Sequence, residues 1–418
     1  MRKVRLAVFG YGNRAKKYLT YLESHPGEIE LAGIVDIDKG RLEEARQKYP
    51  SCGQIFYSSS DDFFSSADNV DAVIIGTPDD THYGLCMKAL EHGCHVLLEK
   101  PAAQTMRQCR DIMAESARQK AHVILCYVLR YHPLYACLKG ILASGKYGDI
   151  VSINHIVNVG IDRTCHTFVR GPWGDSKTTN PMIVSKCCHD LDLIVWLTGQ
   201  KAKRVSSFGS LRWFRAENAP QGSAGRCIDC GIENRCPFSA PDLYLRRKEW
   251  TGNFIVPQGS TLEEVLEKEM KEGRYGRCVY HCDNDVVDHQ VLSMVMDNDI
   301  VVTLSMDCFT MKDSRITDIK CVFGEITVQD NMIMARDFNT GEESVWDFSS
   351  VAGLPLHAGA DLKIVEEFIG KVRASKETER TDKAAASVTP EISNSMESHR
   401  ICFMAEESRL SGMTVSDI

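Results

Sequence analysis

VRLAVFGYGNRA, residues 4–15, is the stretch that decides the fold of the first part of this chain. An apolar run with strand character leads into a glycine turn, and residues 16–24 continue with a helical pattern. A second apolar run over 29–35 ends at Asp36. Strand, glycine turn, helix and a second strand with an acidic tip form a unit that holds a dinucleotide, so we predict a Rossmann-type site here.

Each part of this unit has a task in cofactor binding. Gly10 permits the tight turn, and Gly12 lets a pyrophosphate approach the backbone. The helix offers the free N–H groups of its first residues, Asn13 and Arg14, to the phosphates. Asp36 would accept hydrogen bonds from the ribose hydroxyls and repel a 2′-phosphate, which favours NAD. NADP is the alternative if that carboxylate turns away, with two cations near enough to serve a 2′-phosphate, Lys39 and Arg41.

The bulk properties argue against several functions. The chain has 418 residues, which predicts two or three domains. Its net charge of −8 argues against a general nucleic-acid binder, which would show a basic face. No apolar run approaches the roughly 20 residues that cross a bilayer, and no signal-peptide pattern precedes the first strand. We therefore expect a cytoplasmic protein without nucleic-acid or membrane partners.

The alternation of strands and helices continues along the first third of the chain. Apolar runs over 71–76, 95–98 and 123–127 are separated by helical patterns over 82–92 and 106–120. This rhythm predicts a doubly wound parallel sheet, whose ligands lie beyond the carboxyl ends of the strands. The residues at those ends should ring one crevice: Asp36, Thr77, Pro78, Glu99, Lys100 and Tyr127.

Lys100 is the first candidate for catalysis. It follows a buried strand, and Pro101 fixes the backbone immediately after it. A lysine here could donate to a substrate hydroxyl and stabilise a developing alkoxide. Partial desolvation near a cofactor would lower the pKa of the amine, which suits proton transfer. The plain alternative is a solvated surface lysine.

Three motifs together resemble the glucose–fructose oxidoreductase, inositol dehydrogenase and rhizopine catabolism (Gfo/Idh/MocA) family: the glycine turn, Thr77-Pro78 with His82, and Glu99-Lys100-Pro101. Segments 127–133 and 357–361 also resemble parts of that family, so the likeness runs along nearly the whole chain. The resemblance implies NAD(P)-dependent hydride transfer from a secondary hydroxyl of a sugar, glycoside or cyclitol, with Lys100 taking part in catalysis. The residues that it implies around the cofactor and substrate are His82, Glu99, Tyr127 and Arg130.

The texture of the sequence changes from about residue 150. Alternating or apolar runs with few long helices between them predict strands over 150–157, 287–296, 301–308, 318–322 and 325–328. Such runs suggest an open, mostly antiparallel sheet. The predicted fold class is therefore α/β, with an N-terminal Rossmann doubly wound parallel sheet and a C-terminal α+β domain.

These patterns predict three parts of the chain. An NAD-binding domain should span 1–127, and a substrate and oligomerisation domain should span 128–355. The remainder, 356–418, should pack back on the first domain through a final helix near 392–410, after a polar loop over about 375–393. In the family that the chain resembles, the open sheet usually mediates dimers or tetramers, so we expect a homo-oligomer.

His189 is the second catalytic candidate. The run from Lys186 to Leu197 predicts a buried helix with His189 at its first turn, and Asp192 shares a face with that histidine. In the family, a histidine at this position removes the hydroxyl proton while hydride leaves the carbon, and the aspartate would orient the neighbouring structure. Ser185 stands where relatives often carry aspartate, so the usual Lys–Asp–His trio is incomplete. Lys186 could supply a replacement charge at the substrate or point to solvent.

A cysteine-rich insert at about 212–285 is a feature that family members in general lack. It holds a C-x₂-C pair followed by further thiols, which favours a structural zinc site. The predicted ligands are Cys227, Cys230, Cys236 and Cys282, with Cys278 as the alternative fourth ligand. An iron–sulfur cluster on the same thiolates and a set of free thiols are the alternatives.

Polar residues at the end of the insert form the last candidate group. Asp285 or His289 could reach the substrate, and an exposed loop is the plain alternative. Nothing in the sequence ranks one polyol above another. Two further functions stay open. One is a redox-neutral enzyme that keeps NAD bound while it cleaves or rearranges a glycoside, and the other is a non-catalytic sensor of NAD and a sugar.

Overall fold

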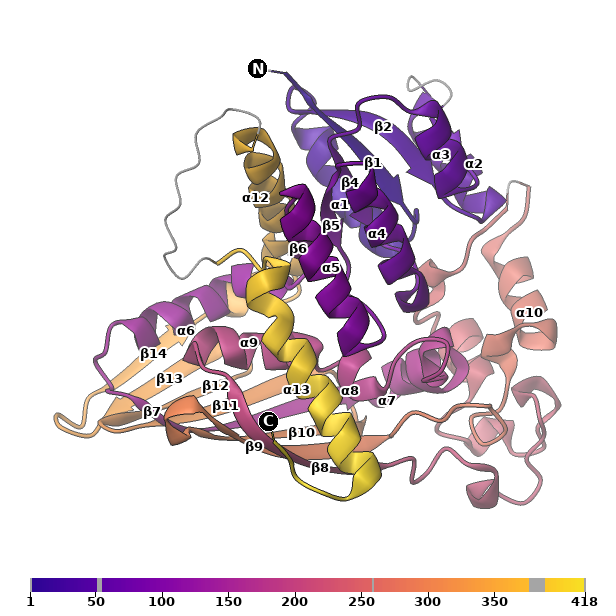
Figure 1. The fold of residues 1–418 in the computed structure, drawn as a ribbon. Helices are drawn as coiled ribbons and strands as arrows, with labels where there is room; N and C mark the ends of the chain where they lie inside the picture. Colours follow the sequence, from indigo (N-terminus) through magenta and orange to yellow (C-terminus); the bar gives the residue numbers. More distant parts are fainter. Residues whose placement is uncertain (1, 51–54, 258, 376–387, 417–418) are drawn as a thin grey trace. The chain divides into compact units, whose positions relative to one another are not determined.

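The computed structural model describes residues 2–50, 55–257, 259–375 and 388–416 (Figure 1). The chain forms two compact units, each built from several segments. Unit 1 consists of Met1–Ala143, Asp192–Leu197 and Phe348–Arg400. Unit 2 consists of Ser144–Leu191, Thr198–Asp347 and Ile401–Ile418.

Unit 1 contains a six-stranded sheet in which all neighbouring strands are parallel, in the order β3-β2-β1-β4-β5-β6. Its strands are β1 (Val4–Phe9), β2 (Ile29–Val35), β3 (Phe56–Tyr57), β4 (Ala72–Ile75), β5 (His95–Leu98) and β6 (Val123–Leu125). Strands β4 and β5 are buried along their whole length, as their apolar sequences require. The strand order reverses between β1 and β4, and ligands of such sheets bind at this switch point.

Helices pack on both faces of this sheet (Figure 1). They are α1 (Asn13–Ser24), α2 (Lys39–Lys48), α3 (Ser60–Ser66), α4 (His82–Glu91), α5 (Met106–Gln119) and α12 (Ala360–Ala374). The same unit also contains α6 (Pro133–Ala143) and the short α11 (Pro355–Ala358). The side chains of Asp38, Ser59 and Thr105 cap α2, α3 and α5 by accepting backbone N–H bonds. Ile364 and Phe368 of α12 lie in the same core as β1, so this late helix is part of the first unit.

Unit 2 contains a nine-stranded sheet in the order β14-β13-β12-β11-β7-β10-β9-β8-β15. Among the described strands, β7 and β10 are parallel neighbours and the other pairs are antiparallel. The strands are β7 (Ile150–Gly160), β8 (Ala202–Ser210), β9 (His289–Met296), β10 (Val301–Thr310), β11 (Ser314–Cys321), β12 (Gly324–Gln329), β13 (Met332–Asp337), β14 (Glu343–Asp347) and β15 (Val415–Ser416). A parallel Rossmann sheet and a mostly antiparallel second sheet confirm the predicted fold class.

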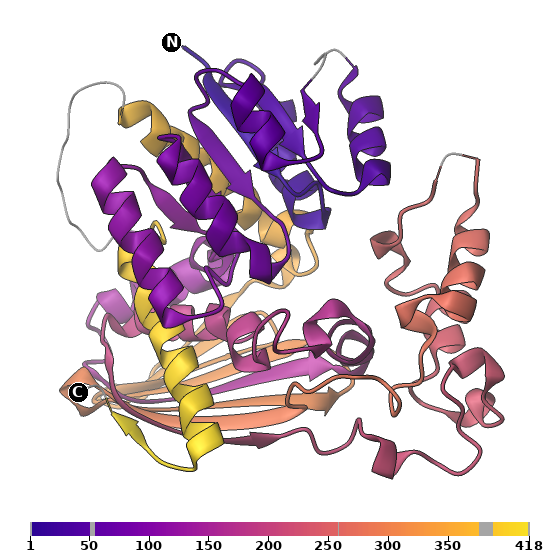
Figure 2. The same cartoon turned by 45° about the vertical axis from the view of Figure 1, so that its right-hand side comes forward.

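The two faces of the second sheet differ. One face is covered by α8 (Met182–Ser185), the start of α9 (Cys188–Thr198) and the later part of α13 (Ile392–Ser411), as Figure 2 shows. Ser207 of β8 donates its N–H to Ser408 of α13, and the thiol of Cys402 in α13 donates to the carbonyl oxygen of Ile183 in α8. On the opposite face the side chains are partly or fully exposed, Phe208 among them. The strands therefore alternate between a core side and an uncovered side.

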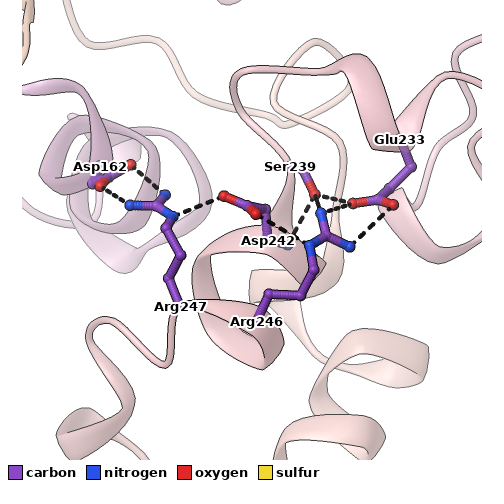
Figure 3. A network of polar contacts seen from close by, with 6 residues as sticks. All are labelled: Asp162, Glu233, Ser239, Asp242, Arg246 and Arg247. Carbon is purple, nitrogen blue, oxygen red and sulfur yellow. Dashed lines mark hydrogen bonds and ion pairs between the residues drawn. The ribbon is translucent and has the colours of Figure 1, made fainter.

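The insert between β8 and β9 has a small core of its own. Helix α10 (Leu262–Glu272) starts with a capping box, and its Leu266 packs with Tyr244 and Leu243. Ion pairs add to this core. Arg247 binds both carboxylate oxygens of Asp162, at 2.6 and 2.9 Å, and Figure 3 shows how this contact joins the insert to α7 (Ile161–Arg163). In the same network, Arg246 forms ion pairs with Asp242 and Glu233.

Two predictions about the chain as a whole meet the structure in different ways. Helix α13 occupies the region predicted for the final helix. Of the polar loop predicted over about 375–393, residues 376–387 lie outside the described residues. No helix in the described ranges combines the length and the apolar character that crossing a bilayer requires.

Candidate active site

The glycine turn lies at the carboxyl end of β1, at the switch point of the first sheet. Gly10 has a φ of +85°, and a Cβ atom there would stand 2.8 Å from the carbonyl oxygen of Gly76. Glycine alone meets both demands without strain. Gly12 precedes α1, and a Cβ atom there would have no neighbour closer than 3.9 Å. The space before the first N–H groups of α1, from Asn13 onward, is therefore wide enough for a phosphate.

Asp36 is buried at the end of β2, next to this turn. Its Oδ2 accepts the backbone N–H of Tyr11 at 2.7 Å, and its Oδ1 accepts that of Asp38 at 2.8 Å. The guanidinium of Arg41 lies 3.6 Å from the same carboxylate. Arg41, which the sequence offers as a ligand for a 2′-phosphate, is therefore paired with the acid that would repel that phosphate.

The side chain of Arg14 is committed to carboxylates of the protein. Its Nε donates to Glu99 at 2.7 Å, and its Nη2 donates to Asp361 at 2.8 Å and to the hydroxyl of Tyr18. Burial alone would raise the pKa of Glu99, but the cations of Arg14 and Lys100 outweigh it and lower that pKa. The predicted contact of Arg14 with the cofactor thus falls to its backbone N–H, while its side chain holds Glu99.

Lys100 lies two residues after the end of β5 and is half-buried. Its backbone N–H donates to Oε2 of Glu99 at 3.1 Å, so the acid that Arg14 holds also fixes the backbone of Lys100. Thr77 and Pro78 follow β4, which pairs with both β1 and β5. The glycine turn, the Thr77–Pro78 loop and Lys100 therefore leave three adjacent strands at the same edge of the sheet.

Two buried histidines hold the loop that contains Lys100. His82 lies 2.7 Å from the carbonyl oxygen of Pro101 through Nδ1 and 2.9 Å from that of Thr77 through Nε2. His399 accepts the N–H of Ala102 on its Nε2 at 2.9 Å. His82 is therefore a link between two loops of the site, which differs from the direct cofactor contact that the sequence predicts.

Tyr127, a predicted substrate-binding residue, is fully buried in this structure. Its hydroxyl lies 3.1 Å from Ser398 and 3.1 Å from Nδ1 of His399. Burial lowers the pKa of His399 to about 4, and the cation of Lys100 acts in the same direction. The ring is neutral near pH 7, so Nδ1 carries the proton while Nε2 accepts from Ala102. Tyr127 thus supports the Lys100 loop through His399.

Arg130 and Asp192, both candidates for the site, are paired with each other. Both side chains are buried, and the guanidinium donates to the two carboxylate oxygens at 2.8 and 2.5 Å. Burial acts to lower the pKa of Arg130, but Asp192 raises it overall. A bidentate buried pair of this kind has no free group to offer a ligand.

His189 and Lys186 lie at the junction of α8 and α9 in unit 2, and both are half-buried. The next residue, Asp190, is fully buried and accepts hydrogen bonds from Nε2 of His155 at 3.2 Å and from Nε of Arg315 at 2.5 Å. Burial alone would raise the pKa of Asp190, but Arg315 and His155 hold it well below its usual range. The helix that carries His189 is thereby fixed to strands β7 and β11.

His289 and Asp285 are not placed as substrate ligands. His289 is the first residue of β9 and lies on the uncovered face of the sheet, since its neighbour Gln290 is buried on the helix-covered face. Nδ1 of His289 contacts Asp288 at 2.9 Å. Asp285 accepts both the N–H and the hydroxyl proton of Ser176, at 2.7 and 2.8 Å, and so closes a loop.

The cysteines of the insert lie near enough to interact electrostatically, Cys227 with Cys236, Cys278 and Cys282 among them, but they do not form a set of metal ligands. Cys227 contacts Nη2 of Arg170 at 3.6 Å, and the thiol of Cys282 donates to the carbonyl oxygen of Cys278 at 3.2 Å. Within the described residues, which include every predicted ligand, no three Cys, His, Asp or Glu side chains are close enough together to hold a metal ion. The predicted zinc site, Cys227, Cys230, Cys236 and Cys282 with Cys278 as alternative, is therefore not supported.

The first unit matches a known protein family. Residues 4–127 match the family described as the GFO_IDH_MocA oxidoreductase family with an NAD-binding Rossmann fold. This is the stretch that holds the glycine turn, Asp36 and Lys100. Over residues 4–127 the chain matches the Gfo/Idh/MocA family. The resemblance stated from the sequence motifs is thereby confirmed.

Curated relatives of this family member match over about half their length. A putative oxidoreductase YteT of Bacillus subtilis is 25% identical over 52% of this chain and 52% of its own length. Inositol 2-dehydrogenase 1 of Saccharopolyspora erythraea is 30% identical over 49% of this chain and 57% of its own length. A solved oxidoreductase from Agrobacterium radiobacter, in complex with NAD+, L-tartaric acid and magnesium, shares the fold across 99% of this chain and 98% of its own. Its TM-score is 0.69 and its sequence identity is 15%.

The supporting residues of the site escape prediction from the sequence. His399 is 297 residues from Ala102, the residue that it holds, and Asp361 is 347 residues from Arg14. Arg315 lies on a strand whose sequence shows no motif. The one available signal was the 357–361 segment, whose likeness to the family points to Asp361.

Proposed function

We propose that this family member is an NAD-dependent dehydrogenase that oxidises a secondary hydroxyl of a sugar or cyclitol. The observation that carries the proposal is the carboxyl edge of the first sheet, where the glycine turn, Asp36 and Lys100 follow strands β1, β2 and β5. NAD, when bound, would accept the hydride. Gly12 and the N-terminus of α1 would hold its pyrophosphate, and Asp36 its ribose.

Lys100 and His189 are the proposed proton-transfer residues. Oxidation of a secondary alcohol to a ketone removes a hydride from carbon and a proton from oxygen. The imidazole of His189 would accept that proton, and the ammonium of Lys100 would donate a hydrogen bond to the same oxygen as its charge develops. Glu99, His82 and His399 would keep the backbone of Lys100 in place during this step.

The relatives favour the same class of reaction. Several carry the name inositol 2-dehydrogenase, which is a cyclitol dehydrogenase by name. Each matches over only 57% of its own length. The reaction type is therefore carried over to this chain and the inositol substrate is not.

A substrate screen tests the proposal. The protein would be incubated with NAD and a panel of sugars, glycosides, sugar acids and inositols, and NADH formation would be followed by its absorbance. With the best substrate, Lys100→Met and His189→Gln should each lower kcat by about 10²–10⁴-fold, the range for loss of an acid or base. Binding of NAD, measured by calorimetry, should change by less than about threefold.

Lys17→Met provides the matched control, because this exposed lysine lies on α1, in the same unit as Lys100. It should leave kcat unchanged. Full activity in both Lys100→Met and His189→Gln would contradict the proposed roles. Turnover of a glycoside without net NADH would show a redox-neutral enzyme instead.

A further inference from the structure

The amine of Lys186 has no partner in the described part of the chain. Lys186 lies in the turn between α8 and α9, and its half-buried side chain makes no hydrogen bond or ion pair with any described residue. The backbone is helical on both sides, with the N–H of Lys186 bonded to Met182 and that of Asp190 to Cys187. Lys186 and His189 are three residues apart on this helical path, so their Cβ atoms stand roughly 5–6 Å apart.

The carboxylates nearest to Lys186 are already neutralised by other cations. Asp190 is bound by Arg315 at 2.5 Å. Asp313 is bound by Arg163 at 2.6 Å and also accepts the N–H of Gly160 at 3.0 Å. His155 contacts Asp190 through Nε2, and its Nδ1 is 2.8 Å from the hydroxyl of Thr317.

A further carboxylate, Asp162, is excluded as a partner by the insert. It follows Ile161 in α7 and precedes Arg163, but both of its oxygens bind Arg247 (Figure 3). Around Lys186 there are therefore three cations and two carboxylates, and one positive charge remains without a counterion in this cluster.

The surplus positive charge in this cluster affects the pKa of Lys186. Burial lowers the pKa of Lys186 to about 8, and the cations of Arg315 and Arg163 act in the same direction. Asp190 and Asp313 oppose the shift but do not cancel it. The amine is still mostly an ammonium near pH 7, and a bound anion would relieve the repulsion.

We propose that the substrate of this chain is a sugar acid, and that the ammonium of Lys186 binds its carboxylate while His189 acts on a hydroxyl of the same ring. This inference rests on the proposed dehydrogenase function and names its substrate class. A single carboxylate balances the single surplus cation, whereas a phosphate monoester, with a charge of about −1.5 to −2, would exceed it.

Matched pairs of sugars test this proposal. Rates of NADH formation would be compared for glucuronate against glucose, for galacturonate against galactose, and for glucose 6-phosphate. We expect each acid to exceed its neutral partner in kcat/KM by about ten- to a hundredfold, the range for a hydrogen bond to a charged group. Lys186→Gln should remove this preference, and Lys186→Arg should keep most of it.

A pH series adds a readout that a structural role would not move. The KM for glucuronate should rise between pH 7 and pH 9 as Lys186 loses its proton, and the rise should be absent in Lys186→Arg. Lys177→Gln, at an exposed lysine of the same unit, should behave like the parent protein in every assay.

Calorimetry of glucuronate with the protein loaded with NADH separates this proposal from the proposed function. If no sugar is oxidised but glucuronate binds and Lys186→Gln abolishes the binding, the dehydrogenase function fails and the carboxylate site stands. Equal rates with acids and neutral sugars, a preference for glucose 6-phosphate, or a preference for acids that survives in Lys186→Gln would each overturn the proposal.

Discussion

Asp36 joins the glycine turn, the second strand and a nearby cation with one carboxylate. It accepts backbone N–H groups from Tyr11 and Asp38, and it lies 3.6 Å from Arg41. The same group that would bind the ribose therefore also keeps Arg41 from acting as a phosphate ligand. Cofactor preference then depends on this ion pair as much as on the acid itself.

Replacement of Asp36 should shift the cofactor preference. Asp36→Ser removes the charge that repels a 2′-phosphate and releases Arg41, so kcat/KM for NAD should fall about tenfold and NADP should become usable. Steady-state kinetics with both cofactors measures this change. The double variant Asp36→Ser, Arg41→Ala should lose the gain with NADP, and an unchanged preference in the single variant would contradict the role of Asp36.

At the residue scale, motifs predict what lies next to them in the chain and little else. Gly10, Gly12 and Asp36 stand where the local pattern places them, because turn geometry is a local property. Arg130 and Asp192 were predicted separately as substrate ligands, but they are 62 residues apart and neutralise each other. Burial and pairing depend on the packing of distant segments, which no local pattern contains.

Helix α13 supports the site mainly through His399. Its Nε2 accepts from Ala102 and its Nδ1 lies 3.1 Å from the hydroxyl of Tyr127, so the helix joins the loop of Lys100 to the end of β6. The ring is fully buried, which makes its protonation costly. The stability of this contact should therefore depend on pH.

Acid should weaken the contact between His399 and the Lys100 loop. The pKa of His399 is about 4 in the folded chain and about 6.5 when unfolded, so the unfolded state binds the proton more readily. The free energy of unfolding should fall as pH drops from about 6.5 to 4, by about 1.4 kcal/mol per pH unit, and stay constant above this window with respect to this group.

Scanning calorimetry at pH 7.5 and pH 5 measures the effect as a difference in Tm. His399→Gln should lose less Tm between the two conditions than the parent protein. His92→Gln, at an exposed histidine of the same unit, should lose as much as the parent. Equal losses in all three proteins would argue against a buried neutral His399.

The insert has an apolar core and polar contacts of its own, apart from its cysteines. Tyr244 and Leu266 form its core, and Arg226 donates to the carbonyl oxygens of Glu269, Met270 and Gly273 at the end of α10. These contacts and the pair of Arg247 with Asp162 provide order. A C-x₂-C pattern alone does not report them, because it specifies ligand type and not the direction of each thiol.

At the scale of the molecule, the uncovered face of the second sheet is the clearest unpaired surface. Phe208 is 66% exposed and Val291 is 41% exposed, and the two are direct cross-strand partners on β8 and β9. Val301 on β10 is exposed on the same face. Exposed apolar groups on a flat sheet favour burial against a partner, which agrees with the homo-oligomer expected from the family.

Charges on this face should prevent assembly. Phe208→Glu with Val291→Asp would place two carboxylates opposite each other, so sedimentation should show a monomer where the parent protein shows a dimer or tetramer. Leu410→Glu, which changes an exposed leucine on α13, should leave the assembly intact. A parent protein that sediments as a monomer at micromolar concentration would contradict this prediction.

Strand patterns and composition were enough to predict the fold class of the whole molecule. The parallel sheet and the mostly antiparallel sheet both leave a periodic signal in the sequence. Strands β8, β13, β14 and β15 lie outside the predicted ranges. The assignment of Asp192–Leu197 to unit 1, inside a helix that starts in unit 2, has no sequence signal at all.

The division of α9 between the two units limits where this chain can be cut and joined to another protein. A fragment that ends at residue 143 keeps Arg130 but lacks Asp192, and an unpaired buried guanidinium costs about 3–5 kcal/mol. A chimera that joins the first 143 residues to a foreign second half would inherit the same defect unless the donor supplies an acid at this position. Grafting of the nucleotide-binding part should therefore succeed only when the chimera keeps a carboxylate at the Asp192 position, either from α9 itself or from the donor.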